Sequence, residues 1–282
     1  MHDLRYWLLL QSIDGIGPIF FKALVNKFSD PKLVFNAEPE ELLAIPRVNR
    51  KIVEQIINKK NTLENIEILI EQLSEREIKT ITYQNDDYPD ALKDISNAPP
   101  IIYLWGDMPK GKSIGIIGTR DASEQGIKKA TEYAIALSKA GYVIVSGYAK
   151  GIDTAAHLGA VSAGAKTLAV LPTGILKFKV HQELSEIADE FLNQVTLLSE
   201  FYPLSEWSVG NALLRNRITS AFSDKILVIE SGDSGGTLST CEYAKAQGKP
   251  IFLYDGIQSS MDKKILELGA VPITSVDKLL DL

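Results

Sequence analysis

Three glycine-containing segments in the second half of the chain have the residue types that bind phosphate. Each follows a short apolar run and precedes a segment whose apolar residues have helical spacing. Glycine amides at the N-terminus of a helix form an anion-binding concavity. The segments are Ile116-Ile117-Gly118-Thr119-Arg120, Ser146-Gly147-Tyr148-Ala149-Lys150-Gly151-Ile152-Asp153 and Ser234-Gly235-Gly236-Thr237.

A fourth segment, Arg215-Asn216-Arg217, lies between the last two within a predicted amphipathic helix. Arginine binds phosphate through two parallel donors, and an asparagine amide can contact a base or a sugar. Because neighbouring helix positions are about 100° apart, we expect that the two arginines do not both face the core. We predict phosphate contacts from Gly118, Thr119, Arg120, Ser146, Gly147, Lys150, Gly151, Arg215, Asn216, Arg217, Ser234, Gly235, Gly236 and Thr237.

For several other residues near these segments, a structural role is the favoured interpretation. Asp153 is placed to cap the helix that follows it, and Ser123 to begin the helix after the first loop, whose N-terminal amides would face an anion. Gly126 would allow that helix to pack closely. His157 lies one turn into an alanine-rich helix, so packing against the sheet is expected, and Cys241 reads as a small buried residue.

The sequence excludes several functional classes. The third loop has no Gly-Lys-Ser/Thr at Walker A spacing, and the first does not complete the dinucleotide pattern Gly-x-Gly-x-x-Gly. No Ser-His-Asp or Cys-His set and no zinc-ligand spacing emerge, so we expect neither a catalytic residue, a metal nor a cofactor. The net charge of −6 allows only a local basic groove. Apolar runs are strand-length and a signal-peptide pattern is missing, which predicts a cytoplasmic protein without membrane contact.

Two regions differ in their hydrophobic period. Residues 4 to 75 have helical spacing and include Ile13-Asp14-Gly15-Ile16-Gly17-Pro18, the pattern of a helix-hairpin-helix whose glycines let amides approach a DNA phosphate. A second hairpin, Ala44 to Arg50, has no glycine, so phosphate contact and a structural or docking role both stay open. We predict a helical domain over 1–75 and no internal repeat.

From Lys79 onward, strand-length apolar runs alternate with helical stretches of about 10 to 16 residues. This alternation predicts an α/β fold over 76–282, a Rossmann-like, mostly parallel sheet with helices on both faces. Ligands of such sheets bind at the carboxyl ends of the strands. All three glycine loops are expected at that edge.

Taken in order, the three loops, Ser199-Glu200 and Arg215-Asn216-Arg217 resemble the DprA/Smf DNA-processing family. The resemblance covers about residues 75 to 282, and a helical N-terminal unit is also similar to that family. It implies a homodimer that binds single-stranded DNA and loads the RecA recombinase during natural transformation, without catalysis.

Two departures from the family pattern are present. The segment after Leu171-Pro172 reads Thr173 to Lys179 where a Tyr-Pro pair is common, and Ala212 stands where an aromatic residue is usual. Tyr148 or Trp207 could supply the missing base stacking. The chain is also similar to nucleotide phosphoribohydrolases, in which Glu242 would assist N-glycosidic cleavage and Arg217 would hold phosphate. A nucleotide-signal sensor of the same superfamily is the third alternative.

Overall fold

The computed structural model describes residues 3–233 and 235–280. The chain divides into two compact units, Met1–Tyr103 and Leu104–Leu282. The boundary predicted after residue 75 lies inside the first unit, at the end of a long helix, and stays a prediction.

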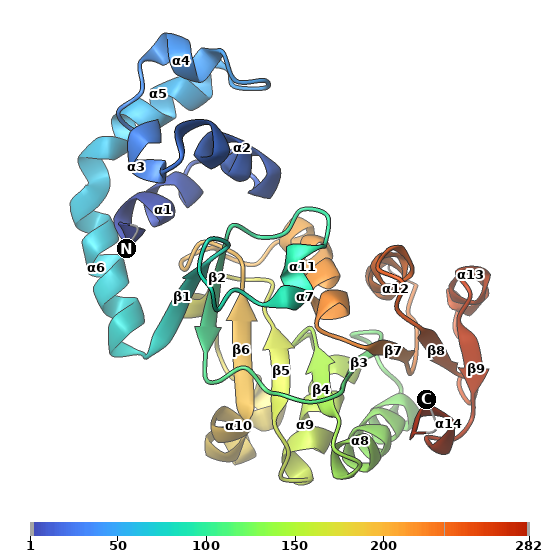
Figure 1. Ribbon diagram of the computed structural model, residues 1–282. Coiled ribbons are helices and arrows are strands. Elements are labelled where there is room, and N and C mark those ends of the chain that lie inside the picture. The colour runs from blue at the N-terminus through green and yellow to red at the C-terminus, as the bar shows by residue number, and fades with distance from the viewer. Residues whose placement is uncertain (1–2, 234, 281–282) are drawn as a thin grey trace. The chain divides into compact units, whose positions relative to one another are not determined.

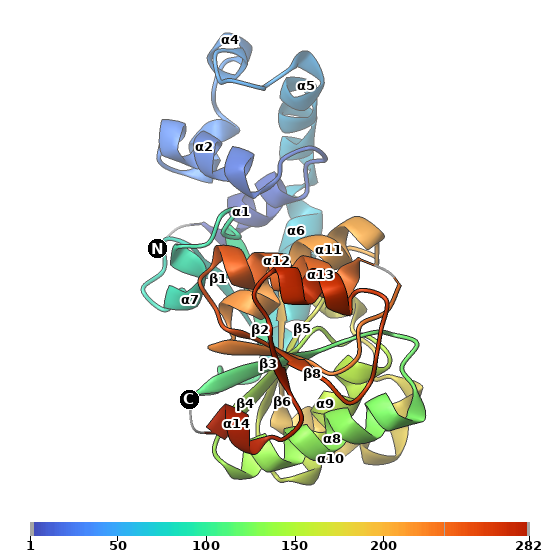
Figure 2. The same cartoon turned by 90° about the vertical axis from the view of Figure 1, so that its right-hand side faces the viewer.

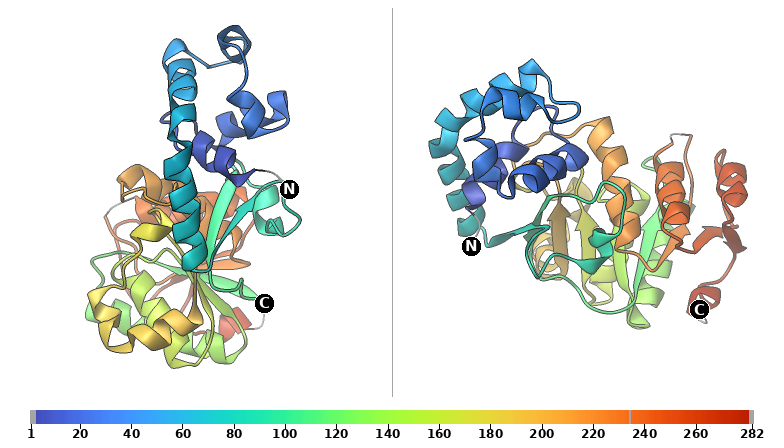
Figure 3. Two further views of the ribbon diagram at one scale, coloured as in Figure 1. Left: turned by 90° about the vertical axis from the view of Figure 1, so that its left-hand side faces the viewer. Right: turned by 45° about the horizontal axis from the view of Figure 1, so that its top comes forward.

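The first unit is mainly helical, as its hydrophobic period predicts, and ends in two strands. Its helices pack as a cluster of short segments, drawn in blue and cyan (Figure 3). The elements are α1 (Leu4–Gln11), α2 (Pro18–Phe28), α3 (Pro31–Val34), α4 (Pro39–Leu43), α5 (Arg50–Lys59), a 3₁₀ turn (Lys60–Thr62), α6 (Leu63–Glu75), β1 (Ile78–Thr82), α7 (Asp90–Lys93) and β2 (Ile101–Trp105).

Two hairpins in the first unit have the same design. Gly15 has a positive φ of 88° before α2, and Arg47 takes the equivalent conformation, with φ 72°, before α5. In each hairpin the next amide closes the turn, from Ile16 to Ile13 at 3.2 Å and from Val48 to Ile45 at 3.1 Å. The expectation of a chain without internal repeats is therefore wrong here: the repeat lies in backbone conformation, and only the first copy has the glycines that reveal it.

The second unit alternates strands and helices (Figure 1). Its strands are β3 (Ser113–Ile117), β4 (Val143–Ser146), β5 (Thr167–Val170), β6 (Val195–Ser199), β7 (Lys225–Val228), β8 (Ile251–Tyr254) and β9 (Val271–Ile273). Its helices are α8 (Glu124–Lys139), α9 (Ile152–Ser162), 3₁₀ turns at Ile175–Lys177 and Gln182–Ile187, α10 (Ala188–Gln194), α11 (Val209–Ala221), α12 (Gly236–Ala246), α13 (Asp262–Glu267) and α14 (Asp277–Leu280).

The strands of this unit form a parallel sheet in the order β6-β5-β4-β3-β7-β8-β9. Figure 2 shows α11, α12 and α13 on one face and α8, α9, α10 and α14 on the other. The α/β class with helices on both faces is confirmed. Because β4 and β7 flank β3 and lead to helices on opposite faces, the loops after β3 and β7 diverge and leave a crevice between them.

Two apolar layers hold the helices to the sheet. On one face Ala130 and Ala134 of α8 and Ala155 of α9 pack on β3 and β4 side chains such as Ile114. On the other face Cys241 of α12 packs with β7 and β8 residues. Strand β9 was not predicted because it is three residues long, contains a proline and has two exposed positions.

Candidate phosphate-binding site

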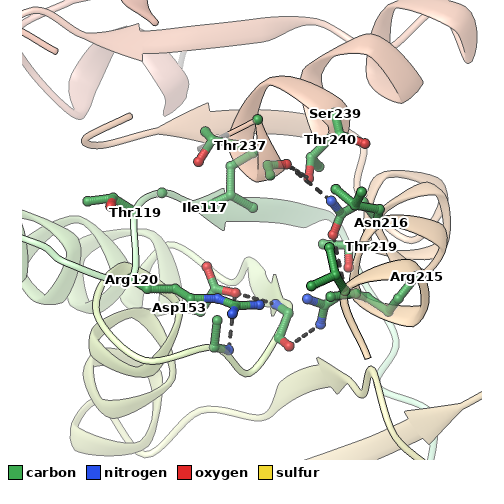
Figure 4. Close-up of a pocket in the computed structure, with 18 of the residues that line it drawn as sticks. Ile117, Thr119, Arg120, Asp153, Arg215, Asn216, Thr219, Thr237, Ser239 and Thr240 are labelled. Carbon is green, nitrogen blue, oxygen red and sulfur yellow. Dashed lines mark hydrogen bonds between the residues drawn. The ribbon is translucent and has the colours of Figure 1, made fainter. Parts of the chain in front are cut away.

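A cavity of about 550 Å³ lies at the carboxyl ends of the central strands, where the sequence places its glycine loops. The structure brings together residues of all three loops and of α11 (Figure 4). Of the predicted residues, those that line this cavity are Gly118, Thr119, Arg120, Gly147, Arg215, Asn216, Gly235, Gly236 and Thr237. Ser146, Lys150, Gly151 and Arg217 do not line it, and Ser234 lies outside the described residues.

The first two loops need glycine because they press against neighbouring segments. A Cβ on Gly118 would lie 2.5 Å from the Ile152 side chain and 2.7 Å from the Glu230 carbonyl oxygen. Gly151 has a φ of 76°, and its Cβ would lie 2.4 Å from the Thr119 carbonyl oxygen. Both glycines thus hold the loops after β3 and β4 in contact, and Gly151 acts from behind the cavity wall.

Arg215 is a structural part of the cavity wall. Its side chain is only 4% exposed, and its Nη1 donates to the carbonyl oxygens of Gly147 and Val170. A Cβ on Gly147 would lie 2.5 Å from the guanidinium, so a side chain there would displace Arg215 from these acceptors. Burial lowers the pKa of Arg215 to about 10. The arginine therefore fixes the loop after β4 to the end of β5.

Asp153 secures the same loop from the other side. It lies in the first turn of α9, whose N-cap is Gly151, so the prediction that Asp153 caps the helix is wrong. Its Oδ2 accepts hydrogen bonds from the amides of Gly147 at 3.1 Å and Ala149 at 3.3 Å. Because α9 begins at Ile152, Asp153 lies inside the helix and not before it. Its carboxylate turns back to the loop after β4. Burial raises the pKa of Asp153, and the nearby Arg215 charge opposes that rise.

Arg217 points away from the cavity into a buried ion pair. Its Nη1 lies 2.5 Å from Glu200 Oε1 and its Nη2 lies 2.6 Å from Oε2, with Arg217 1% and Glu200 6% exposed. Burial raises the pKa of Glu200, and the arginine opposes that rise. The expectation that the two arginines do not both face the core is wrong, because α11 is enclosed on several sides over Arg215 to Ala221.

Arg120 is the exposed cation of the cavity mouth. Its guanidinium lies 5.3 Å from the ring centroid of Trp207, and Trp207 is 48% exposed. Cation–π contact of this kind holds the arginine over the ring while its edge donors stay available. Thr119 is buried, and its Oγ1 accepts from the Asp121 amide at 3.2 Å.

A second cavity of about 360 Å³ shares part of this wall. Arg120, Ala149, Trp207 and Arg215 line both cavities. The second is also lined by Lys150, Lys177, Lys179 and His181. Lys177, Lys179 and His181 were not predicted, although the run Lys177-Phe178-Lys179 in place of the expected Tyr-Pro pair was the signal in the sequence. Lys177 pairs with Glu206 at 2.5 Å.

The third loop presents open backbone at the start of α12. A Cβ on Gly235 or Gly236 would meet no atom within 4 Å, so these glycines face free space rather than a packing neighbour. The buried Asn216 amide donates to the Gly236 carbonyl oxygen at 3.1 Å, and its Oδ1 accepts from Arg215 Nε at 3.2 Å. Asn216 therefore links α11 to α12 (Figure 4).

The N-terminus of α8 already has an anion. Ser123 caps this helix by accepting from the Gly126 amide, as predicted. Glu230 Oε2 accepts from the Ser123 amide at 3.0 Å and from its hydroxyl at 2.9 Å. A Cβ on Gly126 would lie 2.0 Å from that same oxygen, which confirms the close packing. The expectation that these amides face an external anion is wrong, because Glu230 occupies the position.

Four further residues near the loops lie in the protein interior. His157 is fully buried with Nδ1 2.8 Å from Thr167 Oγ1, and burial lowers its pKa to about 3, which confirms a core role. Cys241 is buried, and its pKa is raised to about 12. Tyr148 is 6% exposed and stacks on His181 at 4.1 Å, so its ring is enclosed by protein. Ser146 Oγ donates to the Ile116 carbonyl oxygen at 2.6 Å within the sheet.

The part of the chain that the structure describes contains no group of three or more His, Cys, Asp or Glu residues placed to hold a metal ion. Among the described helices, none combines the length and apolar content that crossing a bilayer requires.

The fold and the cavity define a Rossmann-like protein whose glycine loops meet at the point where the strand order of the parallel sheet reverses. Comparison with family models matches residues 79–282 to DNA recombination-mediator protein A and residues 8–59 to a SAM-like helix-hairpin-helix tandem. The chain belongs to the DNA recombination-mediator protein A family. The tandem match agrees with the repeated hairpin of the first unit.

Individual relatives support this assignment. Protein Smf of Synechocystis is 32% identical over 88% of this chain, which spans 63% of that relative's length. DNA processing protein DprA of Bacillus subtilis is 29% identical over 91% of this chain and 92% of its own length. The solved structure of DprA from Streptococcus pneumoniae matches with a TM-score of 0.76 and 25% identity, covering 100% of this chain and 98% of that one. DNA processing protein A from Helicobacter pylori, whose structure concerns single-stranded DNA binding, has a TM-score of 0.64 and 26% identity, with coverage of 74% and 96%.

Proposed function

We propose that this protein binds single-stranded DNA across the two adjoining cavities. The observation that carries the proposal is the charge of the second cavity. Among the described residues that line it, every charged side chain is cationic, namely Arg120, Lys150, Lys177, Lys179 and Arg215, and His181 can become so. Such a groove neutralises a row of phosphates. The net charge of −6 confines this attraction to one region of the surface.

Apolar groups at the rim favour an unpaired strand. Trp207, Val209 and Leu213 are 48%, 62% and 40% exposed and line the first cavity. Bases of single strands stack on such side chains, and stacking on an aromatic ring contributes about 1 to 3 kcal/mol per base. Trp207 thereby supplies a stacking surface for bases. Ala212, which stands where an aromatic residue is usual, is buried and has no ring to offer.

We propose that the predicted residues fall into two groups for this function. In the first group, Arg120, Lys150 and the loop at Gly235 and Gly236, where an added Cβ would face open space, contact the strand. The other two predicted cations donate to acceptors within the protein. Arg215 fixes the loop after β4, and Arg217 pairs with Glu200. We propose the latter two as positioning residues.

Membership of a recombination-mediator family supports two partners for this chain. We propose that it loads the RecA recombinase on the strand it holds during natural transformation. We further propose that it acts as a homodimer in the cytoplasm.

Fluorescence anisotropy with a labelled oligothymidine of about 35 nucleotides tests the DNA proposal. We expect micromolar or tighter binding at low salt that weakens at physiological salt. Lys150→Ala and Arg120→Ala should each weaken binding and reduce the salt slope by about one. Lys139→Ala, an exposed cation at the far end of α8, is the matched control. Absence of binding by the wild-type protein at low salt would contradict the proposal. In that case Lys150→Ala should also leave RecA loading unchanged.

The phosphoribohydrolase alternative has one supporting observation and one against it. Glu242 lines the first cavity, as that reaction requires, but Arg217, its expected phosphate ligand, is bound to Glu200. Incubation with nucleoside monophosphates should therefore release no free base. Release that disappears in Glu242→Ala would reverse this conclusion.

A further inference from the structure

The two adjoining cavities differ in charge. The first cavity is lined by four charged side chains, Arg120, Asp153, Arg215 and Glu242. Among the described residues, none that lines the second cavity carries a carboxylate. Two carboxylates offset the two arginines of the first cavity, so phosphate is attracted more strongly to the second cavity. A strand that spans both would therefore keep its backbone over the second cavity.

Glu242 is the acidic group of the first cavity that remains available to a ligand. Asp153 is 6% exposed, and its Oδ2 accepts from two loop amides. Arg215 is bound to backbone carbonyl oxygens. Glu242 is exposed and makes no hydrogen bond or ion pair with the described residues. A carboxylate only accepts hydrogen bonds, so its ligand must present N–H or O–H groups.

The other walls of the first cavity suit a nucleobase. Its volume of about 550 Å³ lies in the range of small-molecule sites, and Trp207, Val209 and Leu213 provide apolar surface for a ring. Ser239 and Thr240 of α12 add hydroxyl groups near Glu242. DNA has no 2′-hydroxyl, so the donors that reach Glu242 are those of the base.

We propose that the first cavity receives one unpaired base of the bound strand and that Glu242 selects guanine over thymine. The inference rests on the proposed DNA-binding function and adds base selectivity to it. Guanine offers adjacent N1–H and N2–H donors, which a carboxylate accepts as a pair. Thymine offers a single N3–H between two carbonyl oxygens, which the carboxylate repels. Adenine and cytosine offer one amino group each.

The test compares oligonucleotides of equal length in fluorescence anisotropy with the full chain. Alternating d(GT) repeats let a guanine reach the cavity in any register, and oligothymidine is the reference. A good bidentate contact discriminates between bases by roughly 1 to 3 kcal/mol, so wild-type protein should bind the d(GT) repeat about tenfold more tightly.

Glu242→Gln is the informative variant. The amide presents one donor and one acceptor, which match thymine O4 and N3–H, so the preference for guanine should disappear and affinity for oligothymidine should rise. Glu190→Gln, an exposed glutamate of α10 that lines neither cavity, should keep the wild-type preference.

The outcomes separate this inference from the function on which it rests. If no oligonucleotide binds at low salt, the proposed function fails. If both bind equally to the wild-type protein, or if Glu242→Gln keeps the same ratio, DNA binding stands and base selection by Glu242 is overturned.

Discussion

At the scale of single residues, the two arginines of α11 show how burial changes the role of a cation. Arg215 and Arg217 are 4% and 1% exposed, and each has its own set of protein acceptors. Removing one partner of a buried ion pair leaves the other charge uncompensated in a poorly solvated position. Substitution of Arg217 should therefore lower the free energy of unfolding more clearly than it lowers the affinity for DNA.

Arg217→Met tests that distinction. The substitution keeps apolar volume but leaves the Glu200 carboxylate buried without its partner, so the free energy of unfolding should fall by about 3 to 5 kcal/mol. Urea unfolding measures the change. The double variant Arg217→Met/Glu200→Leu should recover part of it, because no buried charge remains.

Lys128→Met is the surface control for this pair. Lys128 and Glu132 are 4.0 Å apart on α8, with the lysine side chain 75% exposed, and such pairs contribute at most about 1 kcal/mol. An equally small loss for Arg217→Met would show that its pair with Glu200 is solvated. A folded Arg217→Met protein that loses DNA binding would instead favour direct phosphate contact.

Sequence pattern could find the residues of the candidate site more readily than their orientation. The glycine loops meet at the edge of the sheet where their strand-to-helix position places them. The direction of Arg217 could not be predicted, because it depends on how many neighbours enclose α11. Lys177 and Lys179 escaped prediction because their segment is held over the second cavity by contacts distant in sequence, such as the Leu176 amide bonded to the Pro203 carbonyl oxygen at 3.1 Å.

At the scale of elements, long periodic segments were predicted well and short ones poorly. The alternation of apolar runs and helical stretches was sufficient for β3 to β8, because each strand is buried on both faces. The stretch from His181 to Asn193 has helical spacing throughout its length, but the structure divides this region into a 3₁₀ turn and α10. Local spacing does not distinguish these two kinds of helix.

The repeated hairpins give a prediction at this scale. A left-handed conformation costs a non-glycine residue about 1 to 2 kcal/mol, so Arg47 in the second hairpin is strained where Gly15 in the first is not. Arg47→Gly should raise the free energy of unfolding by about 0.5 to 1 kcal/mol, since part of the relief is offset by a more flexible unfolded chain. Gly15→Ala should lower it by about 1 kcal/mol.

Thermal and urea unfolding of both hairpin variants provide the measurement. Arg50→Gly, which places glycine in the first turn of α5 rather than in the hairpin, is the matched control and should be destabilising. A loss of stability in Arg47→Gly would mean that the arginine side chain makes contacts worth more than the strain.

At the scale of the whole molecule, the stability of the fold depends on keeping several buried titratable groups in one protonation state. His157 is fully buried among aromatic rings and has a pKa of about 3, with burial as the main cause. Burial also lowers the pKa of His181 and raises those of Asp153 and Glu200. The histidines and the carboxyl groups affect the pH dependence of stability with opposite sign.

The sign for His157 follows from proton binding. In the unfolded chain its pKa is about 6.5, so between about pH 6.5 and pH 3 the unfolded state binds a proton that the folded state does not. The free energy of unfolding therefore falls as the pH drops below about 6.5, by up to about 1.4 kcal/mol per pH unit. Asp153 and Glu200 oppose this fall, because folded carboxyl groups with raised pKa values bind protons that the unfolded chain does not.

His157→Phe isolates this contribution, because it keeps an aromatic ring and leaves the other titrating groups in place. Between pH 7.5 and pH 5 the wild-type protein should lose about 2 kcal/mol more stability than the variant, as measured by urea unfolding at each pH. NMR of the imidazole nitrogens should show His157 neutral throughout this range. Parallel pH profiles for the two proteins, or an imidazole that titrates near pH 6.5 in the folded state, would show that water reaches the ring and that the core beneath the loop after β4 opens in solution.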